Sequence, residues 1–156
     1  MHGDNPKTKR DIARSKFLEG YDCAQSVLYA YCDDLGLDKN DALKMTSGFG
    51  GGMACKGEVC GAVTGAIIVI GAKHGRGDGA DRTASDLTFI KTREFMDAFV
   101  ERHGTFICRD LLRGCDLTTK EGWKRFKDDD LLNKICVPCV ESAVEILENI
   151  IQPNQH

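Results

Sequence analysis

Apolar residues recur at helical spacing along nearly the whole 156-residue chain, and no segment alternates with the period of two typical of a half-buried strand. Glycine and proline separate the periodic stretches. The pattern predicts helices over residues 7–19, 22–34, 39–47, 60–73, 84–103 and 131–152, with short helices near 105–114 and 118–126. We therefore predict an all-α bundle in a single domain, residues 1–156, with an ordered core from about residue 7 to residue 152.

The stretch 48–72 is expected to organise this bundle. It begins with a loop that has four glycines in five positions, where the backbone must turn sharply or approach another group closely. The helix that follows is apolar on every side, which predicts that it is buried. Gly61 and Gly65, like Ala62 and Ala66, are four residues apart, so one face has almost no side-chain bulk and admits a second helix or a cofactor.

Two later helices carry more specific expectations. Helix 84–103 should direct one apolar set inward: Leu87, Ile90, Phe95, Met96, Phe99 and Val100. Pro138 interrupts the final helical pattern, which predicts a kink or a fresh helix start near Cys136.

Composition removes several classes of function. The chain is 42% hydrophobic and 29% charged with a net charge of −3, so it has no basic surface for nucleic acid. The apolar run 62–72 is shorter than the roughly 20 residues that span a bilayer. The first 16 residues are polar and contain no apolar core of a signal peptide, so we expect a cytoplasmic protein.

Eight cysteines are the unusual feature of the composition: Cys23, Cys32, Cys55, Cys60, Cys108, Cys115, Cys136 and Cys139. In a reducing compartment, such enrichment points to metal ligation or reactive thiols rather than to disulfides. The alternative for each thiol is a plain packing role, since free cysteine is among the most buried residue types.

Four of the eight fall near the start of a predicted helix and on its inward face: Cys23, Cys60, Cys108 and Cys136. Four inward thiols on four helices, with amide donors nearby, form the arrangement that a thiolate-ligated centre in a bundle needs. Cys60, at the start of the apolar helix, is well placed for a stabilised thiolate. Cys32 follows Cys23 by nine residues and therefore falls on the opposite face of their helix.

The order of these residues resembles the C_GCAxxG_C_C family of redox-active proteins over about residues 17–151. The matching pieces are the segment 20–27 (GYDCAQSV) and the run Cys60-Gly61-Ala62-Val63-Thr64-Gly65 behind its glycine-rich loop, followed by Cys108 and Cys136. The resemblance implies a small cytoplasmic helical protein with four shared cysteines. A similarity to the iron–sulfur-bearing part of split-Soret cytochromes implies a cluster.

Three functions follow from these observations. The first is electron transfer or redox sensing by an iron–sulfur cluster on Cys23, Cys60, Cys108 and Cys136, with a redox partner protein. Backbone amides around the cofactor would come from the glycines: Gly50, Gly51, Gly52 and Gly61.

The second function is thiol–disulfide exchange, with Cys60 as the attacking thiolate and a partner thiol: Cys55, Cys136 or Cys139. The third is a structural zinc site, for which the single Cys136-x-x-Cys139 pair is the only local signature. Cys55 or Cys139 can also replace one of the four shared ligands. Whether the protein is an enzyme and whether it is a homodimer, with a cluster bridging the subunits, stay open.

Overall fold

A computed structural model describes residues 6–151, and within this range the chain folds into eight α-helices with no strand. The helices are α1 (Lys9–Leu18), α2 (Cys23–Leu35), α3 (Lys39–Thr46), α4 (Gly61–His74), α5 (Thr83–His103), α6 (Cys108–Leu111), α7 (Lys120–Asp128) and α8 (Val137–Ile150). A 3₁₀ turn, η1 (Ser47–Phe49), follows α3, and a π-helical turn, η2 (Leu132–Cys136), precedes α8. The all-α prediction is confirmed.

Local side chains explain why the first helices begin where they do. Thr8 caps α1, and Asp22 caps α2 by accepting the Gln25 amide at 2.8 Å while Gln25 accepts the Asp22 amide at 2.9 Å. Such caps satisfy amides that have no partner inside the helix. Gly36 ends α2 in the left-handed conformation that favours glycine. The cap at Asp22 directly precedes Cys23 and so fixes the position of the Cys23 side chain at the start of α2.

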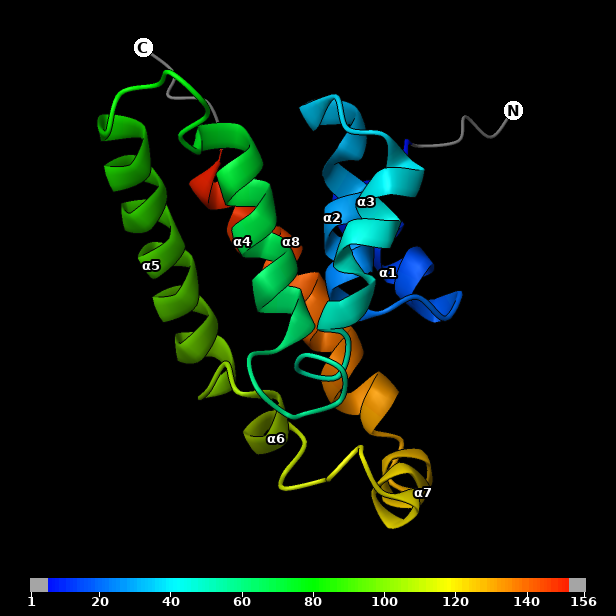
Figure 1. The fold of residues 1–156 in the computed structure, drawn as a ribbon. Helices are drawn as coiled ribbons and strands as arrows, with labels where there is room; N and C mark the ends of the chain where they lie inside the picture. Colours follow the sequence, from blue (N-terminus) through cyan, green and yellow to red (C-terminus); the bar gives the residue numbers. More distant parts are fainter. Residues whose placement is uncertain (1–5, 152–156) are drawn as a thin grey trace.

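The core lies where α2, α4 and α8 pack together, with α1 and α5 on its sides (Figure 1). Val27, Val63 and Val140 are fully buried there. The bare face of α4 admits α2: a Cβ placed on Gly65 would lie 2.9 Å from the Ala24 Cα, so only glycine allows the two backbones to approach this closely.

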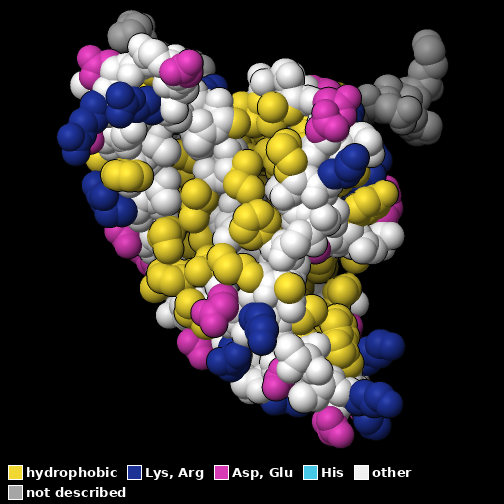
Figure 2. Space-filling view, in the orientation of Figure 1, with side chains coloured by type: hydrophobic (Ala, Val, Ile, Leu, Met, Phe, Trp, Pro, Cys, Tyr) yellow, Lys and Arg dark blue, Asp and Glu magenta, His cyan; other side chains and the backbone are white. Residues whose placement is uncertain are grey.

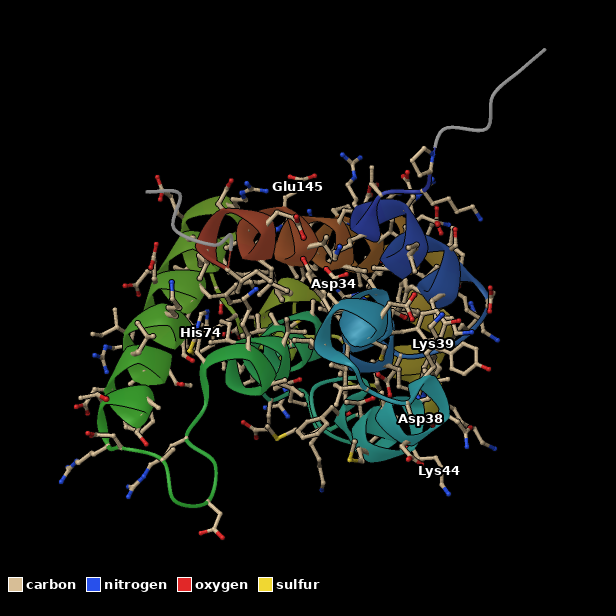
Figure 3. All side chains as sticks on the ribbon, turned by 90° about the horizontal axis from the view of Figure 1, so that it is seen from above. Asp34, Asp38, Lys39, Lys44, His74 and Glu145 are labelled. Atoms are coloured by element: carbon tan, nitrogen blue, oxygen red, sulfur yellow. The ribbon has the colours of Figure 1, made fainter. Side chains whose placement is uncertain are left out.

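The outer side of the bundle is tied by ion pairs around α8. Arg10 of α1 lies 2.7 Å from Glu141, and Arg102 of α5 lies 2.7 Å from Glu145, which Figure 3 labels on the outer face of α8. Exposed pairs of this kind each contribute about 0.2–1 kcal/mol. They orient α1 and α5 on α8 more than they stabilise the fold.

Two expectations about burial were confirmed only in part. Helix α4 is not buried all round, because α2, α5 and α8 cover only part of it and Ile67 and Ile68 keep partial exposure. On α5, Leu87 is 41% exposed and Ile90 is 54% exposed, whereas Phe95 and Phe99 are fully buried. Figure 2 shows the resulting hydrophobic surface over α4 and α5.

The last helical segment behaves as Pro138 indicates. A π-helical turn ends at Cys136, and α8 then begins with Pro138 in its first turn. Proline has no backbone N–H, and the first turn of a helix does not need that donor. The predicted end of this helix at residue 152 lies outside the described residues. None of the helices between residues 6 and 151 is long and apolar enough to cross a bilayer.

Candidate functional site: a cavity lined by six thiols

A cavity of about 370 Å³ lies at the end of the bundle where α2 and α4 begin. We call it the thiol cavity, because six of the eight cysteines line it: Cys23, Cys55, Cys60, Cys108, Cys136 and Cys139. They come from the starts of α2, α4 and α6, from the glycine-rich loop, and from η2 and α8. The fold therefore brings together residues separated by more than 100 positions in the chain.

The thiol cavity contains all four cysteines predicted as ligands and two more. Cys55 and Cys139, predicted as replacement ligands or as exchange partners of Cys60, line the same cavity as the other four. Cys32 does not line it: this thiol is buried on the other face of α2 and donates to the Leu28 carbonyl. Cys115 is also buried outside it and donates to the Gly122 carbonyl.

A short antiparallel pairing aligns Cys60 with Cys108. Val59 and Ile107 form an isolated β-bridge. Beside it the Cys60 amide donates to the Phe106 carbonyl at 2.8 Å, and the Cys108 amide donates to the Glu58 carbonyl at 2.6 Å. Both thiols then begin a helix directly after the bridge. The sequence pattern did not predict this pairing, since two single residues carry no strand periodicity.

The glycine-rich loop forms a left-handed curl in front of α4, visible as the coil between α3 and α4 in Figure 1. Residues 51–55 all have positive φ, between 48° and 72°, and three of them are Met53, Ala54 and Cys55. Each non-glycine residue in this conformation costs about 1–2 kcal/mol. The amides of residues 53–58 donate to the carbonyls of residues 48–53 and hold the curl closed. Strain of this kind is concentrated at functional sites.

The glycines of the curl give the cysteines room. A Cβ on Gly52 would lie 2.7 Å from the Cys108 Cβ, and one on Gly51 would lie 2.9 Å from the Cys55 Sγ. A Cβ on Gly61 would lie 3.0 Å from the Cys23 Cβ, and one on Gly50 would lie 2.8 Å from the Asp22 Cβ. All four glycines also line the thiol cavity.

Two amides of the curl are available to a bound group. Among the described residues, the amides of Gly51 and Gly52 donate to no backbone carbonyl. A buried amide without a partner is costly, so a sulfur or other acceptor in the thiol cavity would stabilise the loop.

Hydrogen bonds among the thiols make Cys60 the preferred thiolate. The thiols of Cys139 and Cys23, as hydrogen-bond donors, lower the pKa of Cys60 well below its usual value. Burial opposes this shift, and the backbone amides of Ala62 and Val63 add to it. The same bonds, with burial, raise the pKa of Cys23 and Cys139, which act as the donors. Cys60 therefore has the strongest nucleophilic character among these three.

The remaining two deep thiols are held neutral. Burial, followed by the nearby Cys60, raises the pKa of Cys108 and of Cys136 to about 12 in each case. Several thiols facing one cavity cannot all ionise unless a positive charge neutralises them. Among Cys23, Cys60, Cys108, Cys136 and Cys139, the pKa shifts therefore favour a single thiolate, at Cys60, unless a cation is bound nearby.

The thiol cavity does not match a single-ion site. Between residues 6 and 151, no three Cys, His, Asp or Glu side chains are close enough together to hold one metal ion. The zinc alternative therefore gains no ligand set from the structure. The donors are nevertheless of one chemical kind, since thiolate is the ligand that iron–sulfur clusters take.

Apolar side chains form a large part of the remaining wall, beside Phe17, Gly20, Asp22, Ser47 and Ala54. They come from α6, α7 and η2 and the segments between them: Leu111, Leu112, Leu117, Trp123, Phe126, Leu132 and Ile135. Trp123 and Phe126 pack edge to face with ring centroids 5.4 Å apart. The sequence indicated only core packing for these aromatic residues. No local signal marks them as a cavity wall, since the wall forms only when α7 folds over the thiols.

Comparison with protein families agrees with the arrangement of cysteines. Residues 21–150 match the family model described as "Putative redox-active protein (C_GCAxxG_C_C)". Comparisons with curated proteins and with solved structures found no match.

Proposed function

The chain belongs to the C_GCAxxG_C_C family, and we propose that it transfers or senses electrons through an iron–sulfur cluster held in the thiol cavity. The ligands would be the four cysteines of the family order: Cys23, Cys60, Cys108 and Cys136. The observation that carries the proposal is the convergence of six thiols from distant parts of the chain on one cavity. A redox partner protein would supply or accept the electrons.

The size and lining of the cavity favour a cofactor over a simple dithiol. A volume of about 370 Å³ falls within the range of about 300–1,000 Å³ found for ligand sites. Forming a disulfide needs only two adjacent thiols and no such space. When bound, the cluster would supply one-electron chemistry, and its positive irons would remove the cost of burying several thiolates.

The protein would tune the cluster through donors next to its ligands. Cys139 lines the cavity beside Cys60 and lowers the pKa of that thiol, so it is the candidate for a hydrogen bond to a ligand sulfur. The amides of Gly51 and Gly52 are further candidates, since each lines the cavity without a backbone acceptor. Such donors raise the reduction potential by stabilising the electron-rich state.

A specific observation also favours a second function, thiol–disulfide exchange. The Cys60 thiolate lies among two donor thiols, Cys23 and Cys139, which is the setting of a reactive dithiol. Cys60 would attack a disulfide of the substrate and release one of its thiols. A second thiol of the protein would then attack the Cys60 sulfur of the mixed disulfide and release the substrate's other thiol, so that a disulfide forms in the protein, which is oxidised by two electrons while the substrate is reduced by two.

Anaerobic purification tests the cluster directly. We expect a visible absorption band, with iron and acid-labile sulfide in the preparation, and little zinc. Replacing Cys108 with Ala should remove the band and the iron. The matched control is Cys32→Ala, which removes an equally buried thiol outside the cavity and should leave both unchanged.

A colourless protein without iron or sulfide, even after reconstitution, would refute the cluster. Thiol titration then examines exchange: a mild oxidant should remove two of the eight thiols, and Cys60→Ala should abolish that loss. Eight free thiols after oxidation would contradict the second function.

A further inference from the structure

The outer face of α5 carries an apolar centre that no part of residues 6–151 covers. Phe89 is 61% exposed and Ile90 is 54% exposed, in the middle of the 21-residue helix. They project opposite to Phe95 and Phe99, which are fully buried against the bundle. Figure 1 shows α5 at the edge of the molecule, and Figure 2 shows hydrophobic atoms over it, between basic and acidic ones.

Four exposed charged residues continue the same stripe on both sides of this centre: Arg82, Asp86, Arg93 and Asp97. Together with Phe89 and Ile90 they lie within an arc of about 100° on the helix. None of the four forms an ion pair with another residue between 6 and 151. Their signs alternate along the stripe: positive, negative, the apolar pair, positive, negative.

This order of charges is self-complementary when two copies of the helix run antiparallel. Aligned about the point between Phe89 and Ile90, Asp86 of one copy faces Arg93 of the other. In the same alignment Arg82 faces Asp97, and Phe89 faces Ile90. A parallel alignment would instead place each charge against its own kind, which is destabilising.

From this pattern we propose that the outer face of α5 is a dimer interface, occupied by the α5 of a second copy of this chain. The contact is isologous, so each attractive pair occurs twice, as two-fold symmetry requires. The apolar centre supplies the area removed from water, and the flanking charges select the antiparallel register.

The interface is small and separate from the thiol cavity. A helix of 21 residues is about 31 Å long, and one helix pair covers less than the roughly 1,600 Å² of a standard interface. We therefore expect a dimer that dissociates on dilution. None of residues 82–97 lines the thiol cavity, so the stripe and the cavity are distinct surfaces of the chain.

Sedimentation velocity over a range of concentrations, in a reducing buffer, tests the proposal. The wild-type chain should pass from 17.1 kDa to twice that mass as its concentration rises. Asp86→Arg and Arg93→Asp each turn two attractive pairs into two repulsive ones and should weaken the dimer at least about tenfold. Far-UV circular dichroism confirms that each variant is folded.

Charge exchange makes the test specific. The double variant Asp86→Arg/Arg93→Asp restores opposite charges and should dimerise like the wild type. An equimolar mixture of the two single variants should form a heterodimer, because its facing pairs again have opposite signs.

A wild-type chain that stays monomeric up to about 1 mM would overturn the proposal and leave the α5 face to a different partner. A dimer that tolerates both single variants unchanged would overturn it as well, since the contact would then lie elsewhere. Failure of the single variants to pair when mixed would refute the antiparallel register. None of these results depends on the cluster in the thiol cavity.

Discussion

Replacing Gly65 with Ala should destabilise the protein, although the same change at Gly71 should stabilise it. Both glycines lie inside α4, and removing either improves the helix propensity by about 0.8–1 kcal/mol. A Cβ on Gly71 meets no atom within 4 Å, so that gain is realised there. A Cβ on Gly65 meets the Ala24 Cα and the Ala24 carbonyl oxygen, each at 2.9 Å.

The structure sets the size of the effect. Ordinary contact begins at 3.4 Å, so α2 must move away from α4 by about 0.5 Å. Ala24 is fully buried and its backbone belongs to α2, so the movement disturbs the packing of the whole helix. Overpacking of this kind costs about 1–3 kcal/mol. Because both variants share the gain in helix propensity, their difference in unfolding free energy should equal this cost.

Urea denaturation followed by circular dichroism, in a reducing buffer, measures this difference. For a chain of this length it corresponds to roughly 2–12 °C in melting temperature. The displacement of α2 also moves Cys23, so Gly65→Ala should increase the reactivity of that thiol whereas Gly71→Ala should not. Equal stability of the two variants, with equal m-values, would refute the close approach of α2 and α4.

Further predictions concern a cap and two buried rings. Asp22→Ala should cost about 1–2 kcal/mol by removing the cap of α2, and it should change the reactivity of Cys23. Asp38→Ala, which removes the cap of α3, should cost about as much in a denaturation curve while leaving Cys23 unaltered. Burial lowers the pKa of His74 and His103 below the usual 6.5, so the unfolded chain binds more protons just below that pH and stability falls as the pH drops through this window. The urea midpoint should therefore decrease between about pH 7.5 and about pH 5.5, and the variant His74→Gln/His103→Gln should show a smaller decrease; an unchanged slope would contradict the assignment.

The buried state of these histidines comes from the packing of helix ends. Figure 3 shows the labelled His74 at the end of α4, beside α5, and its Nε2 atom is buried without a hydrogen-bond partner among residues 6–151. His103, at the end of α5, stacks on Phe99 with ring centroids 4.6 Å apart, and its Nε2 is likewise unpartnered. A hydrogen-bond acceptor added next to either ring would raise its pKa and reduce the loss of stability at low pH.

Most of the helical architecture could be predicted from the sequence alone. Periodic apolar residues between glycine and proline indicated all the longer helices, and a single carboxylate at Asp22 was enough to predict where α2 begins. The spacing of Gly61 and Gly65 predicted a face of α4 that admits another helix, and α2 occupies it. These features depend on residues within one or two turns of each other, so the local sequence contains the information.

Burial on α4 and α5 could not be predicted in the same way. Both helices are apolar on more sides than the bundle covers, and periodicity does not say which side meets a neighbour. On α5 it indicated Ile90 as inward, but the core meets the opposite face, which carries Phe95 and Phe99. The self-complementary charges around Ile90 are the basis for our proposal that this exposed side of α5 meets a second copy of the chain.

The candidate site likewise has features that the sequence predicts and features that depend on the folded chain. The helical pattern along the chain was enough to predict which thiols lie near helix starts: Cys23, Cys60, Cys108 and Cys136. Only the tertiary structure brought Cys55 and Cys139 to the same cavity, and only it paired Val59 with Ile107 and wound residues 51–55 into a left-handed curl. Helix caps and helical faces depend on residues that are neighbours in the chain. The cavity depends on contacts between residues more than 100 positions apart, and a local sequence pattern cannot predict such contacts.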